Sequence, residues 1–203
     1  MFRIAVAIIV LLQLAFCIDQ SQLSDCLYGS LKKLIKIEKT YNYLFKNYDK
    51  ICDLLESSAY KVQKCNPKDQ KQFYHTTTFY RLMCTYFEEE LEDHMPCLEQ
   101  HAISIDRSCN KECGSPSDPE EQKKYNSCRK TECATICYFK KFSEACPRAK
   151  DVLYRFNMKQ IYDLLESSNE EEVRNLHQDC AHLMDKEYMS NKLVGTIYGE
   201  KLA

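Results

Sequence analysis

The sequence predicts an all-α fold, a disulfide-stapled bundle of about five to seven helices. Three observations predict this fold. Apolar residues recur at every third or fourth position along most of the chain, as they do on one face of a helix. Only four glycines and five prolines interrupt the 203 residues. The chain also contains 13 cysteines, a number typical of secreted, cross-linked proteins and unusual in a reducing compartment.

The N-terminal residues 1–17 have the pattern of a secretory signal peptide. Arg3 precedes an apolar run of about 13 residues, which is shorter than the roughly 20 residues that a membrane anchor needs. Ala15 and Cys17 are the small residues that precede a cleavage site. We therefore expect the mature chain, residues 18–203, to be secreted to the extracellular space without a membrane span.

Removing the signal peptide leaves an even number of cysteines, which predicts a disulfide framework whose pairing a single sequence does not show. Cys109-x3-Cys113 and Cys133-x3-Cys137 resemble zinc-ligand pairs, but the chain has no CxxC pair and no matching histidine cluster. We expect no metal and no cofactor. The expected disulfide cysteines are Cys26, Cys52, Cys65, Cys84, Cys97, Cys109, Cys113, Cys128, Cys133, Cys137, Cys146 and Cys180.

The length of the mature chain suits one cysteine-rich helical domain with its own core. Two halves would meet near residues 114–118, within the loop sequence CGSPSDPE. The formal charge of −2 becomes −3 when Arg3 is removed with the signal peptide. This slightly acidic balance argues against nucleic acid and anionic lipid as partners.

The first helical region follows the apolar residues of positions 23–51 and has a break expected near Thr40. The second region has the clearest start, with Asn66 as N-cap, Pro67 as the first helical residue and Asp69 in the first turn. Its apolar face continues to Leu91, and Pro96 is expected to interrupt it before a shorter helix carries Cys97, His101, Ile105, Cys109 and Cys113.

After the glycine- and proline-containing loop, Asp118-Pro119 with Glu121 predicts a new helix start. Pro147 restarts a helix with an apolar face that reaches Leu164. A last apolar stripe runs from Val173 to Leu183.

The hexapeptide DLLESS occurs twice, at Asp53–Ser58 and at Asp163–Ser168. The preceding residue is Cys52 in the first copy and Tyr162 in the second. We interpret both copies as helix ends, at which the leucines close an apolar face and the serines lead into the next helix. In the second copy Ser168 and Glu171 form a capping box. Duplication of a helix pair is the alternative. A catalytic role is disfavoured because one Asp and one Glu do not make a site.

Glu90, His94, Cys97 and His101 have the spacing of metal ligands on one helical stripe. Pro96 should break that stripe, and a cysteine in an oxidising compartment favours a disulfide over a metal. The acidic run EEELED and the run NEEE lack the alternating oxygens and central glycine of a calcium loop. We expect none of these residues to bind a metal.

No catalytic motif is present in the sequence. Phospholipases A2 are secreted, helical and disulfide-rich, but they need a His-Asp pair and a glycine-rich calcium loop. This chain has HQDC at His177–Cys180 and no glycine-rich loop. The nucleophile elbow, the HExxH zinc helix and the phosphate loop are also missing. We expect no enzymatic activity and no catalytic residue.

The order of the cysteines resembles that of a known family. The matching features are Cys26 on an amphipathic helix, the spacings Cys52-x12-Cys65 and Cys84-x12-Cys97, the cluster from Cys109 to Cys146, and Cys180. Over about residues 26–180 the chain resembles the nematode secreted cysteine-rich "domain of unknown function 19" family, which is related to the chondroitin proteoglycan 4-type domain. The resemblance implies secretion, a disulfide-stapled helical fold and no established enzymatic activity. The chain has no Ser-Gly dipeptide, unlike the proteoglycan relatives.

We expect the function to be that of a secreted binding or interaction protein without catalytic activity. Its partner would be an extracellular protein, a glycan or a small apolar ligand. One alternative is a helical carrier with an internal cavity for a small apolar ligand or lipid, lined by some of the 14 tyrosines and 9 phenylalanines. A divergent secreted hydrolase is a further alternative.

Overall fold

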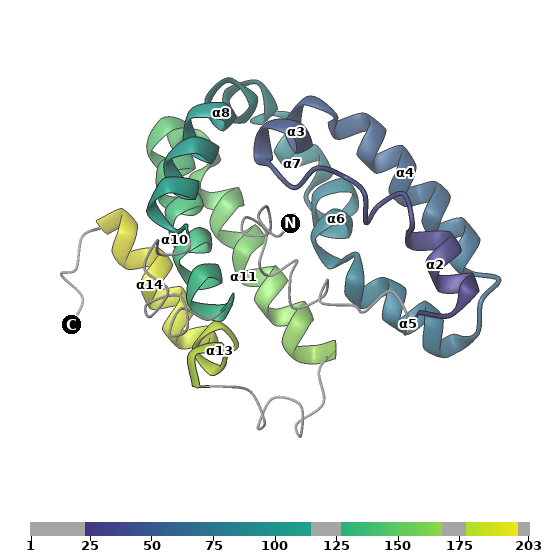
Figure 1. Cartoon of the computed structure of the whole chain (residues 1–203). Coiled ribbons are helices and arrows are strands. Elements are labelled where there is room, and N and C mark those ends of the chain that lie inside the picture. Colours follow the sequence, from purple (N-terminus) through teal and green to yellow (C-terminus); the bar gives the residue numbers. More distant parts are fainter. Residues whose placement is uncertain (1–22, 115–126, 168–177, 199–203) are drawn as a thin grey trace, which may run out of the picture.

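The computed structural model describes residues 23–114, 127–167 and 178–198 (Figure 1). All regular structure in these three ranges is helical, which confirms the all-α, disulfide-stapled fold. The expected signal peptide and most of the loop near residues 114–118 lie outside the described residues. In the described ranges, no helix combines the length and the apolar character that crossing a bilayer requires.

The helices are shorter and more numerous than the expected five to seven. The described ranges contain 11 α-helices, together with one π-helical turn and one 3-10 turn. In chain order these elements are α2 (Asp25–Leu31), α3 (Tyr41–Lys46), α4 (Tyr48–Val62), α5 (Pro67–Thr76), α6 (Thr78–Arg81), η2 (Leu82–Tyr86), α7 (Glu88–Glu92), α8 (Met95–Glu112), α10 (Ser127–Ala145), η3 (Pro147–Ala149), α11 (Lys150–Ser167), α13 (Gln178–Leu183) and α14 (Lys186–Tyr198).

Short breaks explain the larger number, because the apolar stripe continues across them. Thr40 caps α3 by accepting a hydrogen bond from the backbone N–H of Tyr43, at the break that the sequence predicts. Asn47 then separates α3 from α4. Thr77 and Phe87 interrupt the second helical region in the same way. None of these break positions is a glycine or a proline, so composition gave no sign of them.

The two proline-containing helix starts have different outcomes. Asn66 caps α5 by accepting a hydrogen bond from the backbone N–H of Asp69, with Pro67 as the first helical residue, and this confirms the prediction. Pro96 is the second residue of α8, so it begins a helix of 18 residues instead of interrupting one. A proline in the first turn loses no intrahelical hydrogen bond, which is why α8 accommodates it.

The interpretation of DLLESS as a helix end was wrong for the first copy. Asp53–Ser58 lies inside α4, which continues to Val62. Ser57 is exposed, but Ser58 is buried, so tertiary packing on that face keeps the segment in the helix. The second copy forms the last described residues of α11, which reaches Ser167. The predicted capping box that starts at Ser168 lies outside the described residues.

In the described part of the chain, buried apolar side chains form two clusters. The larger core extends from α2 through α8 and includes one face of α10, with Leu27 and Leu98 fully buried. The smaller core joins α10 and α11 to α13 and α14 through Ile161, Leu183 and Leu193. Helix α11 packs against α6 and η2 on one side and against α10 and α14 on the other, between the two groups of helices (Figure 1).

One buried carboxyl group joins three helices of the larger core. Asp106 in α8 accepts hydrogen bonds from the backbone N–H groups of Tyr41 (3.2 Å) and Asn42 (2.8 Å), the first two residues of α3. It also accepts one from the hydroxyl of Tyr138 in α10 (3.1 Å). Burial raises the pKa of the Asp106 carboxyl, and the hydrogen bonds offset part of that rise. Helices α8 and α10, on either side of residues 114–118, are therefore joined through one polar centre and one core.

Candidate functional site

Twelve cysteines form six disulfides, with Cα–Cα separations between 5.0 and 6.0 Å. Such separations are usual for disulfides. None of these twelve sulfurs is a free thiol, so they supply neither a nucleophile nor a zinc ligand in this state. The pairs are Cys26–Cys65, Cys52–Cys84, Cys97–Cys146, Cys109–Cys137, Cys113–Cys133 and Cys128–Cys180.

The cysteines that the sequence presented as possible zinc pairs connect α8 to α10. Cys109 and Cys113 lie one turn apart at the end of α8 and its cap. Each binds a cysteine of α10, Cys137 and Cys133 respectively. The spacing of three residues is thus the spacing of two disulfides on facing helices.

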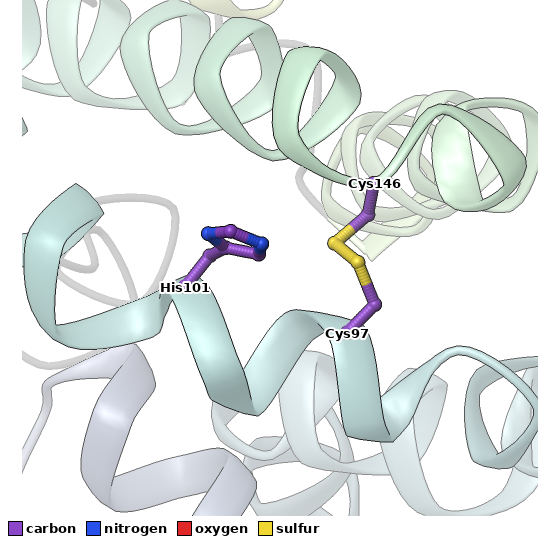
Figure 2. Close-up of side chains that lie close together, drawn as sticks. All are labelled: Cys97, His101 and Cys146. Atoms are coloured by element: carbon purple, nitrogen blue, oxygen red, sulfur yellow. A yellow bond between two sulfur atoms is a disulfide. The ribbon is translucent and has the colours of Figure 1, made fainter.

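The four residues weighed as metal ligands do not form one stripe. Glu90 lies in α7, where its carboxylate pairs with the guanidinium of an arginine in α11. His94 is the N-cap residue of α8. Cys97 is bonded to Cys146, and only His101 remains near it (Figure 2). These side chains therefore do not converge on one point.

A groove of about 590 Å³ opens between α11, α14 and the end of η2. This volume lies within the roughly 300–1,000 Å³ that is usual for small-molecule sites. A second depression of similar size, between α3, α4 and α8, is lined mainly by charged and amide side chains. The groove beside α14 is lined by Tyr86, Phe87, Tyr154, Arg155, Met158, Lys159, Tyr162, Lys186, Glu187 and Ser190.

Helix periodicity explains why these residues line the same groove. Tyr154, Met158 and Tyr162 recur at steps of four, so they share one face of α11. Lys186 and Ser190 have the same spacing on α14. The hydroxyls of Tyr154 and Ser190 share a hydrogen bond of 2.8 Å, which fixes the two walls against each other.

Two tyrosine rings of the groove are exposed, and each lies under a lysine. Tyr86 is 62% exposed and Tyr162 is 38% exposed, unlike most large apolar side chains of the protein. The Lys186 ammonium lies 3.9 Å from the centre of the Tyr162 ring, and the Lys159 ammonium lies 5.4 Å from the centre of the Tyr86 ring. Such cation–π contacts orient both the ring and the charge.

The cations of the groove differ in how their charge is compensated. Arg155 lies between the carboxylates of Glu90 and Asp151, and these hydrogen bonds raise the pKa of its guanidinium. Lys159 binds a carboxylate one turn further along α11, and this bond raises the pKa of its ammonium. Lys186 has no carboxylate partner among the residues that the structure describes. Its ammonium is thus the charge in the groove that can meet an anion.

The aromatic residues of the larger core pack on one another. The ring centres of Tyr41 and Tyr138 are 4.6 Å apart, and those of Phe79 and Phe156 are 5.4 Å apart. The cavity that these rings border holds about 40 Å³. A volume of that order accommodates a few water molecules at most, and a fatty acyl chain needs far more.

Comparisons of this chain with protein-family models, with curated proteins and with solved structures found no match. The assignment of the groove as the candidate site therefore rests on its geometry alone. Sequence reasoning missed most of the groove, because Tyr86 and Lys186 belong to elements far apart in the chain. The sequence held one indication of a groove residue, because Tyr162 takes the place of Cys52 where the two DLLESS segments are aligned.

Proposed function

We propose that the protein is a secreted, disulfide-stabilised extracellular binding protein without catalytic activity. We further propose that the groove beside α14 binds a small amphiphile with an apolar body and one anionic group. The observation that carries this proposal is the Lys186 ammonium, which has no carboxylate partner among the described residues and lies over the exposed ring of Tyr162.

The disulfides support an extracellular location. Six disulfides in one chain are common in oxidising compartments and rare in the cytosol. The predicted signal peptide, residues 1–17, leads to the same expectation. Membership of the "domain of unknown function 19" family is part of this proposal and rests on the order of the cysteines.

The chemistry of the groove favours one class of ligand. Tyr86 and Tyr162 offer flat apolar surface to a hydrocarbon or aromatic body, which gains free energy by leaving water. The Lys186 ammonium supplies a charge-assisted hydrogen bond to a carboxylate or a similar anion. Because the groove is open to solvent, the ligand would lie along the surface between α11 and α14.

If the protein is a carrier, its ligand site is the surface groove and not an enclosed cavity. A carrier with an enclosed cavity would need space inside the larger core, where the aromatic rings leave about 40 Å³. An apolar ligand carried by this protein would therefore occupy the surface groove of about 590 Å³.

The proposal can be tested with two fluorescent probes that have the same hydrocarbon chain, one ending in a carboxylate and one in an alcohol. Lys186→Ala should weaken binding of the carboxylate about tenfold and leave the alcohol unchanged, because a charge-assisted bond is lost. Tyr162→Ala should weaken binding of both probes, since the ring contacts the apolar body.

The chain offers a matched control outside the groove. Tyr60 is 63% exposed, and the Lys64 ammonium lies 5.3 Å from the centre of its ring. Tyr60→Ala and Lys64→Ala should leave both affinities unchanged. Equal losses in Lys64→Ala and Lys186→Ala, or no binding of the carboxylate probe, would overturn the groove assignment. Ester hydrolysis that one point substitution abolishes would overturn the non-catalytic assignment.

A further inference from the structure

Among the residues that the structure describes, two disulfides have a titratable side chain close to both sulfurs, and the two side chains differ in charge. A nitrogen of the His101 imidazole and the two sulfurs of Cys97–Cys146 all lie within 4.8 Å of one another. At the other disulfide a carboxylate oxygen of Asp69 lies within the same distance of the sulfurs of Cys26 and Cys65. Figure 2 shows the imidazole beside the first bridge, one turn along α8 from Cys97.

These neighbours act in opposite directions on thiol–disulfide exchange. An imidazole stabilises a thiolate that leaves a disulfide, because it offers an N–H donor and, when protonated, a positive charge. A carboxylate repels an incoming thiolate and destabilises the one that leaves. The Asp69 carboxylate is also fixed in place, since it accepts hydrogen bonds from Ser24 (2.6 Å) and Asn66 (2.9 Å).

Accessibility identifies the sulfur that is attacked. Cys97 and His101 are half-buried, whereas Cys146 is only 3% exposed. An external thiolate therefore reaches the sulfur of Cys97 first. Cys97 is also the third residue of α8, and a helix N-terminus stabilises the Cys97 thiolate that is released when the mixed disulfide is reduced.

We propose that Cys97–Cys146 is a thiol-exchange site, at which a low-molecular-weight thiol forms a mixed disulfide with Cys97. In the first step the thiolate attacks the sulfur of Cys97. A bond forms between these two sulfurs, the bond between Cys97 and Cys146 breaks, and its electron pair leaves on the Cys146 sulfur beside His101. A proton from His101 or solvent then neutralises that thiolate.

A second thiol completes the reduction. Its thiolate attacks the external sulfur of the mixed disulfide, which releases the Cys97 thiolate and the disulfide of the external thiol. Two electrons pass from two external thiols, which are oxidised, to the cystine, which is reduced. This activity does not depend on the groove beside α14.

The test treats the folded, secreted protein with reduced glutathione, quenches the reaction with N-ethylmaleimide at intervals, and maps the modified peptides by mass spectrometry. Glutathione on Cys97 together with maleimide on Cys146 should appear about tenfold faster than opening of Cys26–Cys65. This order is the opposite of what exposure alone predicts, because Cys26 is more exposed than Cys97. Opening of Cys26–Cys65 at an equal or higher rate would overturn the proposal.

Two variants of His101 separate its effect from a merely structural one. His101→Gln should slow opening of Cys97–Cys146 about fivefold without changing the other five bridges. His101→Lys should retain the fast opening, because it keeps a cation one turn from Cys97. An unchanged rate in His101→Gln, with a native circular dichroism spectrum, would also overturn the proposal. If that variant does not fold, the wild-type comparison of the two bridges decides.

Discussion

The larger and the smaller core are stabilised to different degrees by cross-links. Five disulfides have sulfurs in or against the larger core, and one, Cys128–Cys180, belongs to the smaller core. Helix α14 forms one wall of the groove and contains no cysteine, so it is held by packing of Met189 and Leu193 and by hydrogen bonds. The proposed ligand thus meets the less cross-linked part of the molecule.

The number of disulfides in a region does not measure what each one contributes. Cys109–Cys137 and Cys113–Cys133 join the same two helices, so either bridge still holds α8 to α10 when the other is removed. Cys128–Cys180 closes 52 residues, and no other bridge connects the chain beyond Cys146 to the rest. A disulfide that closes a loop alone restricts the unfolded chain more than a redundant one.

The largest expected loss in the free energy of unfolding therefore comes from removing the disulfide of the smaller core. Cys128→Ala with Cys180→Ala should lower the free energy of unfolding by about 4 kcal/mol, as expected for a loop of that length. Cys113→Ala with Cys133→Ala should lower it by about 2 to 3 kcal/mol, because the neighbouring bridge leaves only a short loop to close. Denaturant unfolding of both double variants measures the difference. The reverse order would contradict the comparison.

The next effect tests whether hydrogen bonds stabilise the larger core in addition to its cross-links. Asp106→Ala leaves two backbone N–H groups of α3 and the Tyr138 hydroxyl without their acceptor. The free energy of unfolding should fall by about 3 kcal/mol. Asp151→Ala is the control, since the Asp151 side chain is 80% exposed, and it should change stability by less than about 0.5 kcal/mol. Equal melting temperatures for the two variants would show that the disulfides stabilise the larger core without help from these hydrogen bonds.

Replacing each of two tyrosines in the larger core should have smaller effects on stability, and the two effects should have opposite signs. Tyr138→Phe removes a hydroxyl that donates to Asp106, and it should lower stability by about 1.5 kcal/mol. Tyr80→Phe removes a buried hydroxyl that has no hydrogen-bond partner among the described residues, and it should raise stability by about 0.5 kcal/mol. Thermal unfolding at one pH compares the two. A loss of stability in Tyr80→Phe would reveal a partner for that hydroxyl.

The smallest expected effect concerns the groove. Lys186→Ala removes one cation–π contact at the surface and should lower the free energy of unfolding by about 0.5 kcal/mol. Its effect on the carboxylate probe should be much larger than its effect on stability. A fall of several kcal/mol in this variant would mean that Lys186 holds α14 in place. The loss of binding in Lys186→Ala would then have to be corrected for the fraction of protein that is unfolded without ligand.

The sequence by itself determined the features that depend on neighbouring residues. The cap at Asn66 with Pro67 and the restart at Pro147 are contacts within one helical turn, and the structure has both. Apolar periodicity over the same short range identified the all-α class. These signals are reliable because the interacting groups are at most four residues apart, where backbone geometry fixes their separation.

The tertiary structure alone decided the partners of the cysteines, the breaks at Asn47 and Thr77, and the groove. The disulfides join residues that are 20 to 52 positions apart, and no local rule selects among such pairs. The first DLLESS segment shows the same limit: it lies within α4, although its residues predict a helix end. Which side chains meet depends on how whole helices pack, because the free energy of burial is gained between segments that are distant in the chain.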